Sequence, residues 1–238
     1  ADLEAADAEL QAALDAVAAE VRERVAPPIE RVWQDEIAAL RTDLRIWLRH
    51  MAAAGDRWRP LWFEYGFGLP LDAGRDPASR REDVVLPGGA RLRGSIDLVE
   101  QAHDGEAFRV TDHKTGRDST PPLLVVGGGE VLQPVLYALA VEAATGREVL
   151  ESRLWYCTTR GGFAERVVPM NHTARERAAT VLAIVDRAIE LGNFPPAPRE
   201  QACRWCEFRA VCGPYEEERA RRKDGHELAD LSHLRGLR

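Results

Sequence analysis

The sequence predicts an α/β protein in which a mixed central sheet is flanked by helices. Two patterns support this class: apolar residues recur at helical spacing in the first fifty residues and in two later segments, and strand-like segments bounded by turn residues lie between them. The chain has 238 residues, of which 45% are hydrophobic and 30% charged. This ordinary globular composition, at this length, allows a sizeable core in one large domain or two small ones.

Helices are expected where apolar residues repeat at intervals of three and four. Pro27-Pro28 separates the first two, and Gly146 and Gly192 follow the last periodic residues of the next two, as glycine commonly does at helix ends. A charged segment near the C-terminus predicts one more short helix. The expected helices cover 3–26, 28–54, 130–145 and 173–191, with the charged helix ending near 223.

Strands are expected between loops rich in Gly, Pro and Asp. Four strand-like segments precede the third helix and two follow it, the last two joined across Arg160-Gly161-Gly162. The expected strands cover 61–69, 83–86, 90–100, 108–114, 149–158 and 163–170. The predicted organisation is an N-terminal helical extension (1–56), a core that includes a cysteine cluster (57–223), and a tail (224–238).

The formal net charge of −7 argues against a protein that coats nucleic acid nonspecifically, although a local basic channel is compatible with an acidic body. No apolar run approaches the ~18 residues that span a membrane, and the acidic first segment lacks the basic start of a signal peptide. We therefore expect a cytoplasmic protein without membrane contact. The absence of Met at position 1 fits either Met removal before Ala1 or excision from a longer polypeptide.

Two carboxylates and a lysine lie on neighbouring strand patterns. Asp97 is in Gly94-Ser95-Ile96-Asp97, and Asp112 and Lys114 are two apart in the next strand, so their side chains share a face. A carboxylate that binds a metal beside a cation that orients water or neutralises phosphate is typical of a metal-dependent phosphodiesterase. Asp97 and Asp112 are therefore candidate metal ligands and catalytic residues, with Lys114 as their cationic partner.

Three more residues are candidates for the same site. Gln133 and Tyr137 are four apart at the start of a predicted helix, so both can face the strands and position substrate. Glu64 has apolar neighbours on both sides, and a carboxylate in such surroundings usually needs a partner or a metal. Two or three carboxylates with water and a phosphate oxygen suit Mg²⁺ or Mn²⁺.

Four cysteines form a second candidate site. Cys203, Cys206 and Cys212 have C-x2-C-x5-C spacing, which in a cytoplasmic chain indicates a bound metal rather than disulfides. Cys157 completes a set of four thiols that suits either Zn²⁺ or an iron–sulfur cluster, and the spacing alone does not choose between them. The alternative for Cys157 is a small buried residue of the core.

The combination of these motifs resembles the PD-(D/E)XK nuclease superfamily, and within it the RecB-like and AddB-like nuclease domains and the related CRISPR-associated exonucleases. The resemblance covers roughly 61–215. It rests on Gly94-Ser95-Ile96-Asp97 as the first aspartate motif, Asp112-His113-Lys114 as the D-x-K motif, and Gln133-Pro134-Val135-Leu136-Tyr137 as a Q-x3-Y motif.

The resemblance implies a restriction-endonuclease-like core that hydrolyses DNA phosphodiesters, with Asp97 and Asp112 as ligands of Mg²⁺ or Mn²⁺, Lys114 positioning water, and Gln133 and Tyr137 holding DNA. Glu64 would fill the preceding acidic position. It implies exonuclease action on single strands or duplex ends in recombinational repair, either as part of a helicase-nuclease with a helicase domain or subunit, or as a stand-alone enzyme.

The same resemblance favours a [4Fe-4S] cluster over zinc as a C-terminal staple. The chain departs from better-known members in one respect: no cysteine precedes Cys157, whereas their distant cysteine precedes the nuclease motifs. Relatives also carry a metal-binding histidine in an early helix, but the surroundings of His50 do not match that motif, and its role stays open. Two alternatives remain: a catalytically silent module that binds DNA ends or single strands, and a zinc-stapled protein-interaction domain.

Overall fold

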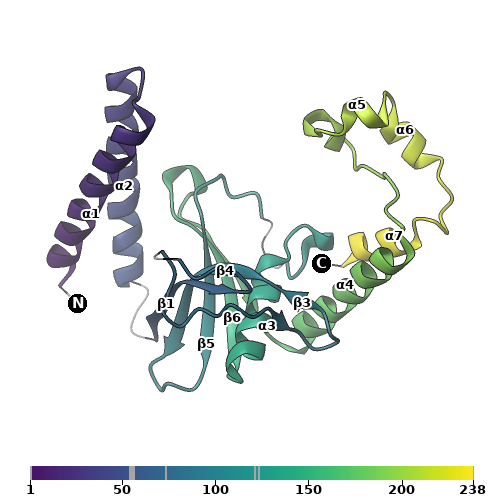
Figure 1. Ribbon diagram of the computed structural model, residues 1–238, viewed down its shortest axis with the longest axis horizontal. Coiled ribbons are helices and arrows are strands. Elements are labelled where there is room, and N and C mark those ends of the chain that lie inside the picture. The colour runs from purple at the N-terminus through teal and green to yellow at the C-terminus, as the bar shows by residue number, and fades with distance from the viewer. Residues whose placement is uncertain (1, 54–56, 73, 121, 123, 238) are drawn as a thin grey trace.

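A computed structural model describes residues 2–53, 57–72, 74–120, 122 and 124–237 (Figure 1). Its first two helices, α1 (Leu3–Val25) and α2 (Glu30–Ala53), form a hairpin that projects from the rest of the molecule and contains no buried residue. Ala26 ends α1 with a positive φ of 46°, and Pro27-Pro28 then prevents the helix from continuing. Position 54, where the second helix was predicted to end, lies outside the described residues, as do 55 and 56 at the predicted domain boundary.

The centre of the molecule is a mixed sheet, as predicted, and this sheet has five strands. Its order is β1-β4-β5-β6-β7, and of its neighbouring strands only β5 and β6 run parallel. A parallel pair requires a crossover, which is supplied here by helix α3 (Gln133–Thr145). The strands are β1 (Trp58–Phe67), β4 (Gly94–Ala102), β5 (Phe108–Lys114), β6 (Val149–Tyr156) and β7 (Glu165–Pro169).

The strand predicted over 90–100 is divided in the structure. Its first part, β3 (Arg91–Leu92), pairs with β2 (Val84–Val85) in a separate two-stranded sheet, whereas β4 starts at Gly94 and pairs with β1. The sequence pattern continues through both parts, but the hydrogen-bonding partner changes at Arg93. The change of pairing partner therefore divided a segment that local alternation joined.

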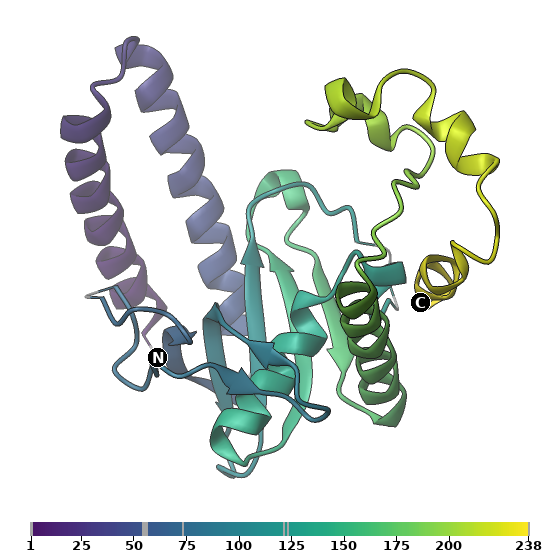
Figure 2. The same cartoon turned by 45° about the vertical axis from the view of Figure 1, so that its right-hand side comes forward.

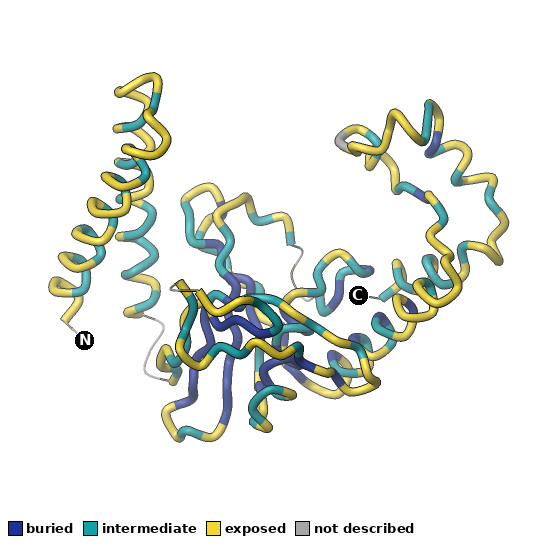
Figure 3. The backbone as a smooth tube through the Cα atoms, viewed as in Figure 1, coloured by how far each residue is buried: buried dark blue, intermediate teal, exposed yellow. Residues whose placement is uncertain are grey.

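Helices α3 and α4 (His172–Leu191) contribute to the main core on one side of the sheet (Figure 2). Val99 and Val110 are register neighbours on β4 and β5, and both are fully buried in the cluster that includes Val135 and Ala138 of α3. Helix α4 is started by Asn171, whose side chain accepts a hydrogen bond from the backbone N–H of Ala174 at 3.0 Å. The sheet and α3 hold most of the buried backbone (Figure 3).

A buried ionic network lies within the sheet. Glu100 of β4 accepts two hydrogen bonds of 2.7 Å from Arg109, and Arg153 of β6 lies 3.3 Å from the same carboxylate. Thr111 connects Glu100 to Arg153, because its hydroxyl donates a hydrogen bond to Glu100 and accepts one from Arg153, each at 2.8 Å. Burial alone would raise the pKa of Glu100, but the hydrogen bond from Arg109 and the charges of Arg153 and Arg109 outweigh it and hold that pKa below its usual value.

The C-terminal segment leaves the sheet and then returns to it. It carries η3 (Ala202–Trp205), α5 (Arg209–Cys212) and α6 (Glu216–Arg221), which lie away from the sheet, before α7 (Ala229–Gly236) comes back beside α4 (Figures 1 and 2). Helix α7 contacts η1 (Gly127–Gly129), where a Cβ on Gly129 would come within 3.0 Å of Leu234. The region predicted as a tail thus contains a docked helix that the sequence analysis did not expect. In the described part of the chain no helix is long and apolar enough to cross a bilayer.

Candidate active site

The candidate site lies where β4 and β5 stop pairing. Asp112 and Lys114 lie on the same side of β5 as the buried Val110, and the Lys114 ammonium is 2.6 Å from Asp112 Oδ2. The side chain of Asp112 is 8% exposed and that of Lys114 33%. Oδ2 has no well-directed hydrogen bond from the described residues, so the contact is an ion pair with unused acceptor capacity on the carboxylate.

Asp97 reaches the same place from β4. The regular pairing of the two strands ends at Leu98 and Thr111, and beyond it the Asp97 carboxylate accepts a hydrogen bond of 2.7 Å from the backbone N–H of His113. Where the next backbone hydrogen bond between β4 and β5 would form, the N–H of His113 thus binds the Asp97 side chain instead. The sequence analysis placed Asp97 and Asp112 on neighbouring strands, and the structure brings both carboxylates to the end of this pairing.

The pKa of Asp112 is raised above its usual value, first because burial disfavours the charged carboxylate. The Lys114 ammonium, 2.6 Å away, opposes this shift, while the negative charge of Asp97 adds to it. A buried carboxylate that lies beside a second one and is paired with the single ammonium of Lys114 is a place where additional positive charge is stabilised. The donor set fits a divalent cation that prefers oxygen ligands.

Gln133 and Tyr137 are placed as the helical spacing predicted. Gln133 Oε1 accepts a hydrogen bond of 2.8 Å from Lys114, and Gln133 Nε2 lies 3.5 Å from the hydroxyl of Tyr137. The Tyr137 ring packs edge-on against Phe67 of β1. A continuous chain of contacts therefore runs from Asp112 through Lys114 and Gln133 to Tyr137.

Glu64 lies at an irregular position of β1. It falls between the register pairs Phe63–Leu98 and Tyr65–Ile96, and so stands opposite Asp97. Its φ of 51° is in the left-handed region, which is unusual for a residue other than glycine. Its carboxylate accepts a hydrogen bond of 3.3 Å from Ser95 and is exposed. Within residues 2–53, 57–72, 74–120, 122 and 124–237, no three or more His, Cys, Asp or Glu side chains form a group that could hold a metal. Glu64 is therefore not brought to the two aspartates as a third ligand.

His113 faces away from Asp112, as the alternation of β5 predicted. Its ring packs against Trp47 of α2 and Trp155 of β6, with ring centroids 5.5 and 6.2 Å away, and the two tryptophans also contact each other. Burial lowers the pKa of His113. The helical hairpin is thus joined to the residue whose backbone binds Asp97. His50, one turn further along α2, stacks on Phe163 at 5.2 Å and does not approach the aspartates through any described contact.

The four cysteines are not assembled into one site. Cys157, just after β6, donates its thiol to the backbone oxygen of Trp155 at 3.1 Å, and desolvation raises its pKa to about 12. Cys203, Cys206 and Cys212 belong to the segment that lies away from the sheet. The pKa of Cys203 is raised, first by desolvation and then by the charges of Glu217, Cys206 and Cys212. Among the described residues these three thiols do not form a group that could hold a metal. The structure therefore does not fit a four-thiol cluster as it stands, because the raised pKa of Cys157 favours its protonated form and the tail segment lies away from β6.

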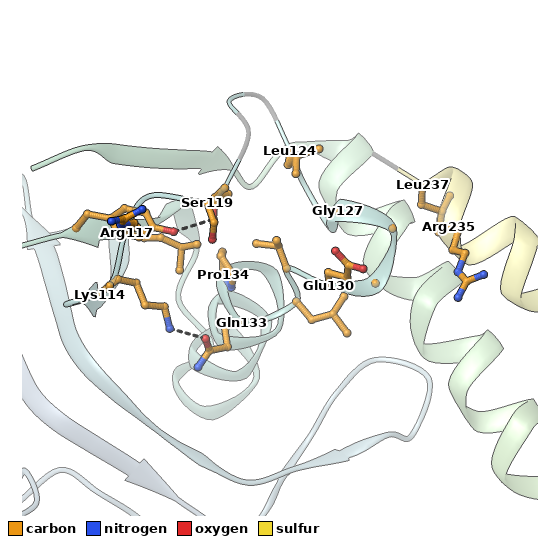
Figure 4. A pocket seen from close by; sticks show the side chains of 18 of the residues that line it. Lys114, Arg117, Ser119, Leu124, Gly127, Glu130, Gln133, Pro134, Arg235 and Leu237 are labelled. Carbon is orange, nitrogen blue, oxygen red and sulfur yellow. Dashed lines mark hydrogen bonds between the residues drawn. The ribbon is translucent and has the colours of Figure 1, made fainter. Parts of the chain in front are cut away.

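A cavity of about 920 Å³ opens beside Lys114 and Gln133 (Figure 4). Arg117 lines it next to the candidate site, and Arg199 and Arg235 line it from the C-terminal segment. The sequence analysis did not place any of these three residues at the candidate site. No local pattern could identify them, because 82 residues separate Arg117 from Arg199.

Comparison with known proteins decides the family. A model of the PD-(D/E)XK nuclease superfamily matches residues 1–213. The chain belongs to this superfamily. The mixed sheet, with the D-x-K pair on β5 and the crossover helix behind it, agrees with a PD-(D/E)XK core.

One curated protein and one solved structure are similar to this PD-(D/E)XK protein. The gene 69 protein of Mycobacterium phage L5 is 31% identical over 171 residues, which cover 66% of this chain and 55% of the phage protein. The chain thus spans about half the length of this curated relative. The crystal structure of SSO0001 is 16% identical, with a TM-score of 0.35 over 82% of this chain and 74% of the other.

In metal-free protein, timed alkylation with iodoacetamide should modify Cys206 first and Cys157 last. Cys206 is exposed, whereas the pKa of about 12 leaves Cys157 with a thiolate fraction of about 10⁻⁴ at pH 8. Peptide mass spectrometry gives the order, and the protein unfolded in guanidinium is the control, in which the rates should converge. Equal rates for Cys157 and Cys206 in the folded protein would contradict the placement described here.

Proposed function

We propose that this PD-(D/E)XK protein is a metal-dependent deoxyribonuclease that acts on DNA ends, with Asp97, Asp112 and Lys114 as its catalytic residues. The observation that carries the proposal is the buried Asp112 carboxylate, which has unused acceptor capacity and lies 2.6 Å from the Lys114 ammonium. Mg²⁺ or Mn²⁺ would be held by Asp112 and Asp97, with its other positions left to water and substrate.

Each residue has a distinct part in the proposed reaction. A bound divalent ion supplies Lewis-acid polarisation of the phosphate and makes a water more acidic. Asp97 and Asp112 hold the site together through the backbone N–H of His113 and the Lys114 ammonium. Lys114 is kept in place by Gln133 and presents its positive charge where negative charge develops on the phosphate. Tyr137 extends the same row and offers a ring and a hydroxyl to the DNA strand.

The exonuclease mode, a role in recombinational repair and a helicase domain or subunit as partner are part of this proposal. They rest on the resemblance to RecB-like and AddB-like domains. The gene 69 protein of Mycobacterium phage L5, of which the aligned region covers 55%, leaves room for such a further domain. Glu64 is proposed to act through Ser95 and the β1 irregularity beside Asp97 rather than as a metal ligand. A cytoplasmic location is also part of the proposed function.

The test is digestion of end-labelled linear DNA and of closed circular DNA in Mg²⁺ or Mn²⁺, with wild type and Lys114→Met. We expect wild type to shorten only the linear DNA, and the substitution to lower the rate by about 10²–10³-fold because one preorganised charge is lost. Arg31→Met is the control, since Arg31 is 91% exposed on α2. Nicking of the circle would replace the exonuclease with an endonuclease. No cleavage by folded wild type would leave the silent DNA-binding module as the better account.

A [4Fe-4S] cluster on Cys157, Cys203, Cys206 and Cys212 is a separate proposal, with Zn²⁺ as the alternative occupant. It requires the tail segment to approach β6 and Cys157 to lose its proton. Its role would be structural. Anaerobically purified protein should then contain iron and resist alkylation at all four cysteines. Protection of only the three tail cysteines would assign the fourth ligand elsewhere, and protection of none would remove the proposal.

A further inference from the structure

The helical hairpin contacts the rest of the molecule along one face of α2. Asp43, Trp47 and His50 follow one another at intervals of four and three residues, so they lie on the same side of the helix. Asp43 accepts two hydrogen bonds from Thr159, of 2.9 Å from the backbone N–H and 2.5 Å from the hydroxyl. His50 stacks on Phe163 at 5.2 Å. The C-terminal half of α2 is therefore attached to the segment between β6 and β7, whereas the rest of the hairpin projects from the molecule (Figure 1).

Trp47 is the residue of this face that reaches β5. Its ring meets the ring of His113 edge-on, with centroids 5.5 Å apart, and lies 5.8 Å from the ring of Trp155. Trp155 is the register neighbour of His113 on β6, so the three rings form one cluster on the side of the sheet away from Asp112. Trp47 Nε1, Trp155 Nε1 and His113 Nε2 are buried and have no hydrogen-bond partner in the described part of the chain. Packing of the rings, and not hydrogen bonding at these atoms, therefore holds the His113 ring.

The backbone of His113 holds one of the two proposed metal ligands. Its N–H donates a hydrogen bond of 2.7 Å to Asp97 Oδ2, and its Nδ1 lies 3.9 Å from the same oxygen. The Asp97 side chain is 32% exposed and lies beyond the regular pairing of β4 with β5. Neither the core nor the strand ladder therefore fixes this carboxylate, and its orientation depends on where His113 lies.

The two proposed ligands are thus positioned by different parts of the chain. Asp112 lies on β5 itself and faces the ammonium of Lys114 at 2.6 Å. Asp97 is oriented through His113, against which α2 packs. Because an ion such as Mg²⁺ requires near-octahedral oxygen geometry, a displaced Asp97 carboxylate would weaken its binding even with Asp112 in place. Support of a ligand by the residues behind it is a general feature of metal sites.

We infer that Trp47 is a positioning residue for the candidate metal site. By packing on His113 it holds the N–H that orients Asp97, and the α1–α2 hairpin acts on the site through this contact. The inference rests on the proposed function for the role of Asp97 as a metal ligand. The ring contacts of Trp47 are with His113 and Trp155, so its effect on the ion is indirect.

The first measurement is hydrogen exchange at the His113 amide of the metal-free protein, by NMR of protein labelled with ¹⁵N at histidine alone. The chain has six histidines, and the signal lost in His113→Gln gives the assignment. We expect Trp47→Ala to speed exchange of this amide by about tenfold or more, the factor that corresponds to losing a hydrogen bond to a charged group. Trp47→Phe keeps a ring against His113 and should exchange like wild type.

The second measurement is Mn²⁺ affinity, from the electron paramagnetic resonance signal of the unbound ion. We expect Trp47→Ala to weaken Mn²⁺ binding by about 10–100-fold, the range found when a residue that supports a metal ligand is changed. Trp33→Ala is the matched control, since Trp33 is half-buried on the same helix and lines a cavity between α1 and α2. It should leave both the Mn²⁺ affinity and the His113 amide unchanged.

Trp47→Leu is the second variant in case Trp47→Ala does not fold. It keeps an apolar side chain on α2 but removes the ring, so it should also speed exchange at His113 and weaken Mn²⁺ binding relative to Trp47→Phe. The other histidine amides should exchange as in wild type. Faster exchange at all six histidines would indicate general destabilisation and would overturn the inference.

The outcomes separate this inference from the proposed nuclease function. Wild-type exchange at His113 and wild-type Mn²⁺ affinity in a folded variant without the Trp47 ring would overturn the inference, even if wild type cleaves DNA. Weaker Mn²⁺ binding with an unchanged His113 amide would overturn the route through His113. If wild type binds no Mn²⁺, the proposed nuclease function fails, and faster exchange at His113 in Trp47→Ala would still support Trp47 as the residue that positions Asp97.

Discussion

Asp112→Asn should lower DNA cleavage by at least about 10³-fold, since it removes the charge of the carboxylate that the proposed metal needs and that Lys114 faces. The substitution keeps the size of the side chain, so the loss should appear in kcat while single-stranded DNA still binds in EDTA. Asp186→Asn, on the exposed side of α4, is the matched control and should cleave like wild type. The measurement is the initial rate of digestion of end-labelled linear DNA in Mn²⁺.

The same substitution should stabilise the metal-free protein at neutral pH. The pKa of Asp112 is raised in the folded state, so the folded protein keeps this proton to higher pH than the unfolded chain does. The free energy of unfolding therefore falls as pH rises from the unfolded pKa of about 3.9 through the raised folded pKa. Above that window the ionised carboxylate is destabilising, and Asn removes this cost.

We accordingly expect a higher Tm for Asp112→Asn than for wild type at pH 7 in EDTA. The two proteins should have the same Tm at a pH below the pKa that Asp112 has in the unfolded chain. Added Mg²⁺ or Mn²⁺ should raise the Tm of wild type and leave the variant unchanged, because only wild type binds the ion. A variant less stable than wild type in EDTA at pH 7 would mean that the Asp112 carboxylate is already well satisfied.

Arg153→Met should lower the free energy of unfolding by about 3–5 kcal/mol, the range found when one partner of a buried ion pair is removed. Arg153 has a side chain only 1% exposed, and it binds Glu100, Thr111 and Glu165 while its guanidinium lies 4.0 Å from the centre of the Trp155 ring. Its loss leaves Glu100 buried with Arg109 as the remaining cation. Urea denaturation gives the value, and Arg45→Met, which breaks an exposed pair with Asp7, should cost less than about 1 kcal/mol.

The pH dependence distinguishes this explanation from a simple packing defect. The pKa of Glu100 is lowered in the folded state, so its stabilising contribution is present above the unfolded pKa of about 4.3 and is lost as pH falls through the folded pKa. Arg153→Met should therefore be most damaging at neutral pH, and the difference from wild type should shrink on acidification. A difference that stays constant down to pH 3 would assign the loss to packing against Trp155.

Much of the candidate site follows from spacing within single elements. Asp112 and Lys114 share a face because alternate residues of a strand point the same way, and Gln133 and Tyr137 share a face because they are one helical turn apart. The α/β class was predicted from such periodic patterns, and the structure confirms this class with its mixed sheet. The roles of these residues in catalysis stay predictions until the substitutions are measured.

Other features depend on segments that are distant in the chain, and spacing carried no information about them. The strand predicted over 90–100 was divided because its two parts pair with different strands. The four cysteines were predicted as one set, although Cys157 and the tail segment lie apart. The alternation of β5 turns His113 away from the site, but spacing within β5 carried no information about its contact with Trp47 on α2.

By itself the sequence determined the fold class, the order of its elements and the residue pairs that one strand or one helix presents together, because these follow from local periodicity. Only the tertiary structure decided that Arg117, Arg199 and Arg235 line one cavity with Lys114, that Arg153 satisfies Glu100 inside the sheet, and that α7 returns to the glycines of η1. These arrangements join residues whose separation along the chain is far longer than any helical or strand period. They are set by which surfaces can be buried together, a property of the whole folded chain.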